Sequence, residues 1–170
     1  LITELSMQSI ERFRSGIGEL DRVLGGGIVP GSVILLGGEP AIGKSTLLLE
    51  LCGKLGKINN KKILYVSGEE SEGQIFDRFS RLKIKSSKLF IYHETIWENI
   101  KEQLNKLQPD LLILDSIQTT HSQELNSVPG TLAQVRDITF EVMSYSKSKG
   151  VPSFIIGHIT KEGSIAGPKI

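Results

Sequence analysis

Residues 38–45 constrain the fold of this chain more than any other segment. They read Gly-Glu-Pro-Ala-Ile-Gly-Lys-Ser, which matches the phosphate-loop pattern G-x-x-x-x-G-K-[ST]. Residues 32–37 before the loop read as a buried strand, and residues 46–55 after it read as an apolar helix. Such a loop offers a polyphosphate backbone N–H groups, the positive end of a helix dipole and one lysine. The segment therefore predicts a nucleoside-triphosphate site between a strand and a helix.

Each position of the loop is a candidate for nucleotide binding. Lys44 is expected to reach the β- and γ-phosphates, and the hydroxyl of Ser45 is expected to bind magnesium. The predicted binding residues are Gly38, Glu39, Pro40, Ala41, Ile42, Gly43, Lys44, Ser45 and Thr46.

Segments typical of strands alternate with segments typical of helices along the chain. Further strands are predicted over residues 61–67, 88–92, 111–115 and 151–157. Capping-box patterns at 71–74 and 95–98 predict two helix starts, and a long helix is expected from Pro129 to a stop at Gly150. A short helix is suggested within residues 16–24. This order predicts an α/β fold with a mainly parallel sheet and helices on both faces.

The composition of the 170 residues fits one soluble domain. The formal net charge is +1, so any contact with DNA must be local. Cys52 is the single cysteine, which excludes an internal disulfide or a multi-cysteine zinc site in this segment and favours a reducing, cytoplasmic setting. No stretch has the length of a membrane span. Because the chain begins with Leu1, we expect an excised piece of a longer protein.

Carboxylates follow two of the predicted strands, where ligands gather in open α/β sheets. Asp115 ends a run of four aliphatic residues and is a candidate magnesium ligand, although it could instead cap the following loop. Glu69 and Glu70 end the second strand. Adjacent side chains on an extended segment point opposite ways, so we expect one of them, Glu69, to face a catalytic water. Alternatively, both are solvated or Glu70 favours the start of the next helix.

His158 ends the fifth predicted strand. A polar side chain there could sense the γ-phosphate and transmit its presence to the glycine-rich residues that follow. The alternative is a structural histidine.

Five blocks of sequence carry a resemblance to a known family. They are the phosphate loop, Ser-Gly-Ile-Gly-Glu-Leu-Asp-Arg-Val-Leu-Gly-Gly-Gly at 15–27, Tyr-Val-Ser-Gly-Glu-Glu-Ser at 65–71, Leu-Asp-Ser-Ile-Gln-Thr at 114–119, and Gly-His-Ile-Thr-Lys-Glu-Gly-Ser-Ile-Ala-Gly-Pro-Lys at 157–169. Together they resemble the RecA-like P-loop ATPases and, more narrowly, the bacterial RadA (Sms) family of DNA repair proteins. The resemblance covers nearly the whole chain, and the last block is its most specific part.

The resemblance implies a RecA-like ATPase core over residues 1–170, with strand order 3-2-4-5-1 and about 15 residues of N-terminal lead-in. It implies a DNA-dependent, helicase-like hydrolase that uses ATP and Mg²⁺, assembles as a hexameric ring and moves on single-stranded DNA. The implied process is branch migration in homologous recombination, together with a recombinase of the RecA type. Lys44 and Ser45 would bind phosphate and metal, Asp115 would be the Walker B residue, and Glu69 would activate water. Two DNA-facing loops are implied, one within 118–131 and a mobile one over 158–170.

The chain also departs from the family pattern. The family's N-terminal four-cysteine zinc module, its Lys-Asn-Arg-Phe-Gly motif and its C-terminal protease-like domain are outside these residues, so zinc is expected only in the missing module. The fragment could therefore bind ATP yet hydrolyse it poorly. Ala41 replaces a glycine that is frequent in the family, which disfavours a positive φ in the loop.

Charge alone does not establish DNA binding, because residues 116–130 contain no lysine or arginine. Backbone N–H groups of glycine-rich loops and repeated contacts in a ring could supply weak, ATP-dependent binding. Two other functions remain open: a regulatory ATPase switch resembling the KaiC-type proteins, and a nucleotide-dependent assembly module.

Overall fold

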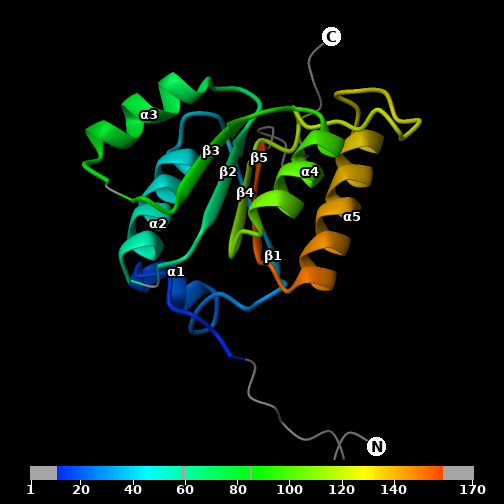
Figure 1. Ribbon diagram of the computed structural model, residues 1–170. Coiled ribbons are helices and arrows are strands. Elements are labelled where there is room, and N and C mark those ends of the chain that lie inside the picture. Colours follow the sequence, from blue (N-terminus) through cyan, green and yellow to red (C-terminus); the bar gives the residue numbers. More distant parts are fainter. Residues whose placement is uncertain (1–10, 59, 85, 159–170) are drawn as a thin grey trace, which may run out of the picture.

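A single five-stranded sheet forms the centre of the molecule, and every neighbouring pair of strands is parallel (Figure 1). The computed structural model describes residues 11–58, 60–84 and 86–158. The strands are β1 (Val33–Gly38), β2 (Ile63–Ser67), β3 (Leu89–His93), β4 (Leu111–Asp115) and β5 (Ser153–His158). Their spatial order, β1-β5-β4-β2-β3, confirms the 3-2-4-5-1 order implied by the resemblance.

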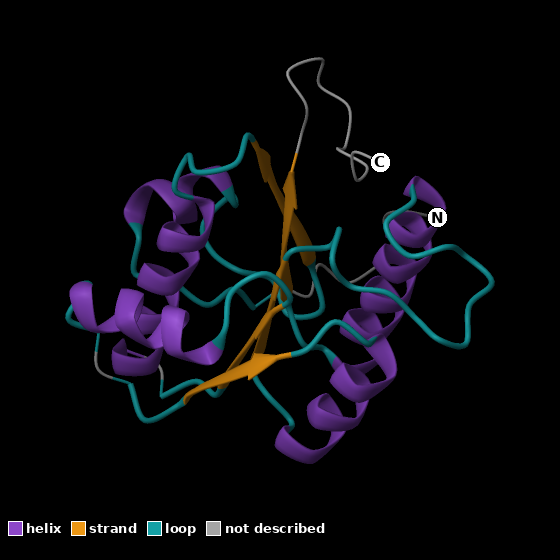
Figure 2. Ribbon diagram, turned by 90° about the horizontal axis from the view of Figure 1, so that it is seen from above, coloured by secondary structure: helices purple, strands orange, loops and turns teal. Residues whose placement is uncertain are grey.

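Helices cover both faces of the sheet (Figure 2). One layer contains α2 (Lys44–Ile58) and α3 (Glu72–Arg81), and the other contains α4 (Trp97–Leu107) and α5 (Leu132–Lys149). A shorter helix, α1 (Gly18–Val23), precedes the first strand and confirms the helix suggested within 16–24. The structure thus confirms the predicted α/β class, and no helix in the described ranges has the length and apolar character required to cross a membrane.

Each face of the sheet has its own apolar core. Residues of β2 alternate between them, because Ile63 and Tyr65 pack with α2 and α3 while Leu64 and Val66 pack with α4 and α5. All five residues of β2 and all five of β4 are buried. This explains why the strand at 111–115 reads as a continuous aliphatic run.

One of the two predicted capping boxes is present at the start of its helix, and the other is not. At α3, the hydroxyl of Ser71 accepts a hydrogen bond from Gln74 N and the side chain of Gln74 accepts one from Ser71 N, which confirms the first capping box. The second prediction, over 95–98, is wrong. Glu94 accepts the N–H groups of Thr95 and Ile96 at 2.7 and 3.0 Å, and Glu98 instead accepts from Ser122 and Gln123.

The start of the long helix also differs from the prediction. Helix α5 begins at Leu132 and not at Pro129, because Thr131 is its N-cap and accepts a hydrogen bond from Gln134 N. Its end is as expected, since Gly150 adopts a left-handed φ of 68° directly after Lys149.

Candidate functional site

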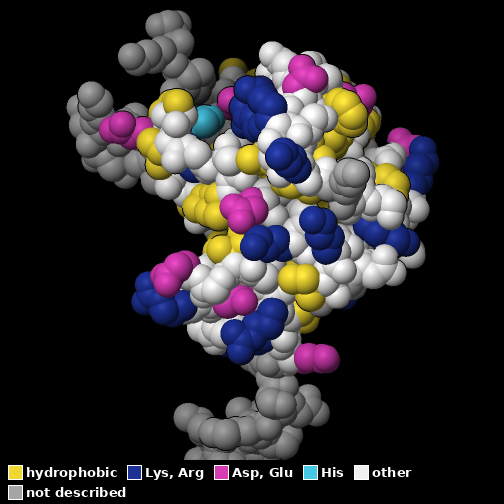
Figure 3. Space-filling model, turned by 90° about the vertical axis from the view of Figure 1, so that its left-hand side faces the viewer, with side chains coloured by type: hydrophobic (Ala, Val, Ile, Leu, Met, Phe, Trp, Pro, Cys, Tyr) yellow, Lys and Arg dark blue, Asp and Glu magenta, His cyan; other side chains and the backbone are white. Residues whose placement is uncertain are grey.

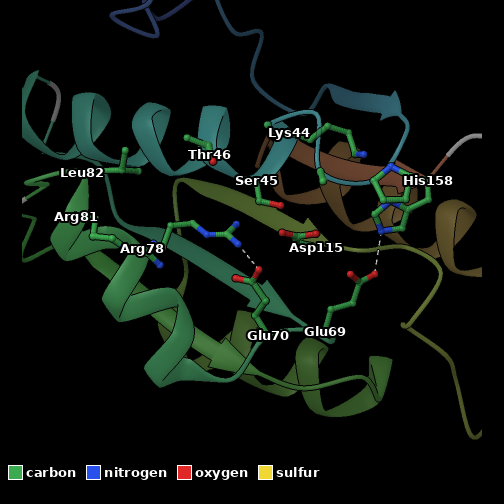
Figure 4. A pocket seen from close by; sticks show the side chains of 13 residues that line it. Lys44, Ser45, Thr46, Glu69, Glu70, Arg78, Arg81, Leu82, Asp115 and His158 are labelled. Atoms are coloured by element: carbon green, nitrogen blue, oxygen red, sulfur yellow. Dashed lines mark hydrogen bonds and ion pairs between the residues drawn. The ribbon is translucent and has the colours of Figure 1, made fainter.

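A cavity of about 550 Å³ opens at the carboxyl ends of β1, β2, β4 and β5, the edge at which the sequence places its polar residues (Figure 4). It is lined by the phosphate loop, the residues after β2, the end of α3 and the tips of β4 and β5. The lining residues are Pro40, Ala41, Gly43, Lys44, Ser45, Thr46, Glu69, Glu70, Arg78, Arg81, Leu82, Asp115 and His158. Lys44, Ser45, Glu69, Asp115 and His158, chosen from the sequence, therefore lie around one space.

Three of the predicted loop residues do not line the cavity. Gly38 ends β1, and its carbonyl accepts a hydrogen bond of 2.8 Å from Lys44 Nζ. The carbonyl of Glu39 accepts a second one, of 2.7 Å, from the same ammonium group. Ile42 is 62% exposed. Gly38 and Glu39 thus position the lysine, and any contact of these three residues with a nucleotide stays a prediction.

The backbone of the loop includes two positive φ angles, 64° at Ala41 and 98° at Gly43. Ala41 thus adopts the positive φ that an alanine disfavours. An alanine in the left-handed region costs about 1 to 2 kcal/mol per residue, so the surrounding structure must compensate for it.

Asp115 and Tyr65 form a buried pair beneath the loop. The hydroxyl of Tyr65 donates a hydrogen bond of 2.6 Å to Asp115 Oδ2. Burial, followed by the charge of Asp115 and this hydrogen bond, raises the pKa of Tyr65 far above its usual range. Tyr65 is consequently a neutral donor, and Asp115 is 6% exposed at the floor of the cavity.

The oxygen atoms of the site fit a magnesium ion that arrives with phosphate. Ser45 and Asp115 face the same cavity as Lys44, and hydroxyl and carboxylate oxygens are hard ligands of the kind that Mg²⁺ prefers. The described residues contain no group of three or more His, Cys, Asp and Glu that could hold a metal ion. Mg²⁺ usually takes one or two carboxylates plus substrate phosphates, and Asp115 with Ser45 offers oxygen atoms of this kind.

Glu69, two residues beyond the end of β2, is held by Ser116, which follows β4, and by His158, the last residue of β5. Ser116 Oγ donates a hydrogen bond of 2.7 Å to Glu69 Oε1, and His158 Nε2 lies 2.9 Å from the same oxygen (Figure 4). Because a carboxylate only accepts hydrogen bonds, the proton of a neutral His158 must be on Nε2. His158 Nδ1 is buried and has no hydrogen-bond partner in the described part of the chain.

Glu70 does not point away from the cavity as the strand alternation predicted. Strand β2 ends at Ser67, so residues 68–70 no longer alternate, and both glutamates line the cavity. Glu70 forms an ion pair with Arg78 of α3. The two acids are therefore distinguished by their partners, a histidine and a serine for Glu69 and an arginine for Glu70.

Several cavity residues were not identified from the sequence. Arg78, Arg81 and Leu82 lie along one side of α3 and its C-cap and form the wall opposite Thr46 (Figure 4). Their spacing of three and four residues on a helix that follows the two glutamates is the signal that could have identified them.

The first of the two predicted DNA-facing loops lies close to this site, and most of the second lies outside the described residues. Residues 118–131 follow Ser116, which donates a hydrogen bond to Glu69, and within them Ser122 donates a hydrogen bond to Glu98. The side chain of Val128 is 66% exposed farther along. Figure 3 shows Lys and Arg side chains dispersed among acidic ones on the face that it displays. No basic stripe is seen among the described residues of that face (Figure 3).

Comparison with known proteins identifies the type of chain. The family model described as "AAA domain" matches residues 3–164. The chain is 50% identical over 169 residues to the DNA repair protein RadA of Campylobacter jejuni and, over the same length, 50% identical to that of Aquifex aeolicus. The RadA protein of Bacillus subtilis is 46% identical. These alignments cover 99% of this chain but 38%, 38% and 37% of the relatives.

A solved structure has the same fold. The crystal structure of a KaiC-like protein of Pyrococcus horikoshii matches with a TM-score of 0.69 over 91% of this chain and 74% of that chain. The sequence identity is 18%, so this likeness bears on the RecA-like fold alone.

Proposed function

The chain belongs to the AAA domain family and is RadA-like along nearly its whole length, and from this premise we propose that it is the ATP-hydrolysing core of a DNA repair protein. The observation that carries the proposal is one cavity at the strand ends, which brings the phosphate loop together with Asp115 and with Glu69, the acid held by His158. The activity, DNA substrate and partners of the whole protein are proposals, because the chain spans little more than a third of the relatives' length.

In the proposed reaction, the N–H groups of the loop bind the phosphates, and Lys44 exchanges a carbonyl partner for a phosphate oxygen. Its ammonium group is already fixed near the loop by the carbonyls of Gly38 and Glu39, at 2.8 and 2.7 Å. The Ser45 hydroxyl and Asp115 would hold the metal. A bound Mg²⁺ ion supplies electrostatic stabilisation of the charge that develops on the phosphates.

Glu69 is the residue that we assign to the attacking water. Ser116 and His158 fix one carboxylate oxygen of Glu69, and no described residue binds the second oxygen, which can then accept a proton or orient a water molecule. His158 adjoins the residues predicted to form the second DNA loop. Movement of Glu69 toward a γ-phosphate would change its bond with His158, which is the proposed route from nucleotide to DNA.

The wall formed by α3 suggests where the remainder of the nucleotide lies. The guanidinium groups of Arg78 and Arg81 and the apolar side chain of Leu82 offer a charged and stacking surface across from Thr46. We assign the ribose and base to this wall. Arg81→Ala should then weaken binding of ATP but leave binding of inorganic tripolyphosphate unchanged, and an equal loss for both ligands would contradict the assignment.

The proposed DNA substrate is single-stranded. Loops of a ring of subunits would bind it weakly and only when ATP is bound. The proposed process is branch migration, together with a recombinase of the RecA type. Charge on this core is nearly balanced, with 20 basic and 19 acidic residues, so backbone contacts and multiplicity must contribute. Filter binding of single-stranded DNA by the full-length protein, with and without a non-hydrolysable ATP analogue, tests this part. No retention in either state would refute it.

The central experiment is ATP hydrolysis by the full-length protein with and without single-stranded DNA. Lys44→Ala should abolish nucleotide binding, whereas Glu69→Gln should retain binding and lose turnover by about 10² to 10⁴-fold, the usual contribution of a general base. The matched control is Glu72→Gln, which alters an exposed carboxylate outside the cavity and should leave the rate unchanged. Full turnover in Glu69→Gln would remove Glu69 from the mechanism.

A further inference from the structure

Tyr65 is a buried hydroxyl that the proposed reaction does not use. It lies on β2 between β3 and β4 and is 1% exposed, with its ring in the apolar core formed with α2 and α3. Its neighbours on that face include Leu48 and Cys52 of α2, the helix that follows the phosphate loop. Phenylalanine would fill such a place without introducing a polar group, so the hydroxyl requires its own explanation.

The hydroxyl of Tyr65 is directed at one atom. It donates a hydrogen bond of 2.6 Å to Asp115 Oδ2, and a short bond of this kind to a carboxylate is among the stronger hydrogen bonds in proteins. Two residues farther along β2, Ser67 pairs in register with Asp115, so the strand on which Tyr65 lies and the strand tip that bears Asp115 are rigidly joined. The side chain of Asp115 is thereby fixed from below.

The hydrogen bond from Tyr65 makes the two carboxylate oxygens of Asp115 inequivalent. Oδ2 is engaged by Tyr65, while Asp115 also faces the cavity that contains Ser45 and Lys44. A carboxylate held in this way offers one oxygen to a ligand in the cavity. Mg²⁺ has a near-octahedral shell and usually keeps several waters, whereas Ca²⁺ readily takes both oxygens of a carboxylate. The arrangement is suited to the smaller ion.

We propose that Tyr65 is a positioning residue that orients Asp115 to present a single oxygen, and that it thereby makes the nucleotide site select Mg²⁺ over Ca²⁺. This inference rests on the proposed function, since it concerns the metal that accompanies the nucleotide. Residues that orient a ligand of a metal typically contribute 10 to 100-fold to its affinity.

The test is binding of a fluorescent ATP analogue to the full-length protein, titrated separately with Mg²⁺ and with Ca²⁺. For Tyr65→Phe we expect unchanged affinity in EDTA, an Mg²⁺ midpoint raised about tenfold, and a Ca²⁺ midpoint within about twofold of the original protein. The control is Tyr92→Phe, on β3, whose side chain packs with the core on the opposite face of the sheet. It should alter neither midpoint.

A second pair of variants isolates the route through Asp115. In an Asp115→Asn background, Tyr65→Phe should not change the Mg²⁺ midpoint further. An unchanged midpoint in Tyr65→Phe alone, or an additional change in the Asn background, would overturn the positioning role. An equal rise for Mg²⁺ and Ca²⁺ would overturn the selectivity. If the original protein binds no nucleotide in any condition, the proposed function fails instead, and the two failures are distinguishable.

Discussion

The left-handed conformation of Ala41 in the phosphate loop predicts that a substitution by glycine raises the free energy of unfolding, which is the opposite of the usual effect. Ala41 has φ 64°, a conformation that glycine adopts at no steric cost. Replacing alanine by glycine normally destabilises a protein, because glycine gains more freedom in the unfolded chain. At Ala41 the relief of strain should exceed that loss, so Ala41→Gly should stabilise the folded chain.

The magnitude follows from two opposing quantities. Strain at a non-glycine residue in the left-handed region is about 1 to 2 kcal/mol. The extra freedom of glycine in the unfolded state is about 0.4 to 1 kcal/mol. The free energy of unfolding should therefore rise by about 0.5 to 1 kcal/mol, which corresponds to an increase in Tm of about 2 to 4 °C per kcal/mol for a chain of this size.

The assay is urea unfolding followed by the fluorescence of Trp97, the single tryptophan, which is 1% exposed in the core. Ala133→Gly is the matched control. It makes the same chemical change in the first turn of α5, where glycine should lower the free energy of unfolding by about 0.5 to 1 kcal/mol. Opposite signs are expected for the two variants. Equal destabilisation by both would refute the argument that the backbone at Ala41 is strained.

Two further predictions concern stability. Gly27→Ala should lower the free energy of unfolding by about 3 kcal/mol in urea titrations. The reason is that Gly27 has φ 142° and an added Cβ atom would lie 2.7 Å from the carbonyl oxygen of Phe13. The control Gly73→Ala, in α3 and with open space around it, should not destabilise the chain. Burial acts to raise the pKa of Glu94, but hydrogen bonds from Ile96, Asn99 and Thr95 outweigh it and lower the pKa below the ordinary value of a glutamate. A lowered pKa in the folded state contributes stability at neutral pH, and this stability is lost as the pH falls below about 4.5. The urea midpoint of Glu94→Gln should therefore depend less on pH in this acidic range than that of the original protein. Equal dependence of the two midpoints on pH would contradict this.

The sequence predicted most of the fold because its local and long-range signals agree. Apolar runs between turn residues marked every strand, and β4 was predicted at its observed bounds because both of its faces are buried. The errors at the start of α4 occur because other side chains make the hydrogen bonds that the capping box would have made. Glu94 binds the backbone that Thr95 was expected to cap, and Glu98 turns to Ser122, a contact 24 residues away along the chain. A local pattern contains no information on such a partner.

The site was predictable to a different degree. The motif places Lys44 and Ser45, and the general rule for strand ends places Glu69, Asp115 and His158. The wall of the cavity was not predicted, because Arg78, Arg81 and Leu82 become neighbours of the phosphate loop only when α3 packs beside α2. The same holds for Tyr65, whose spacing of fifty residues from Asp115 is bridged by strand pairing alone.

The charges around the cavity give a physical reason to expect a divalent cation in the proposed chemistry. Three cationic side chains line the cavity, Lys44, Arg78 and Arg81, and three carboxylates oppose them, Glu69, Glu70 and Asp115. Their formal charges cancel, and Arg78 is already paired with Glu70. Side chains alone therefore offer a triphosphate no net attraction, so its negative charge must be balanced by the N–H groups of the loop and by an ion brought with it. An acid poised for water activation can remain close to the γ-phosphate under these conditions, because the ion on Asp115 would screen the two negative groups from each other.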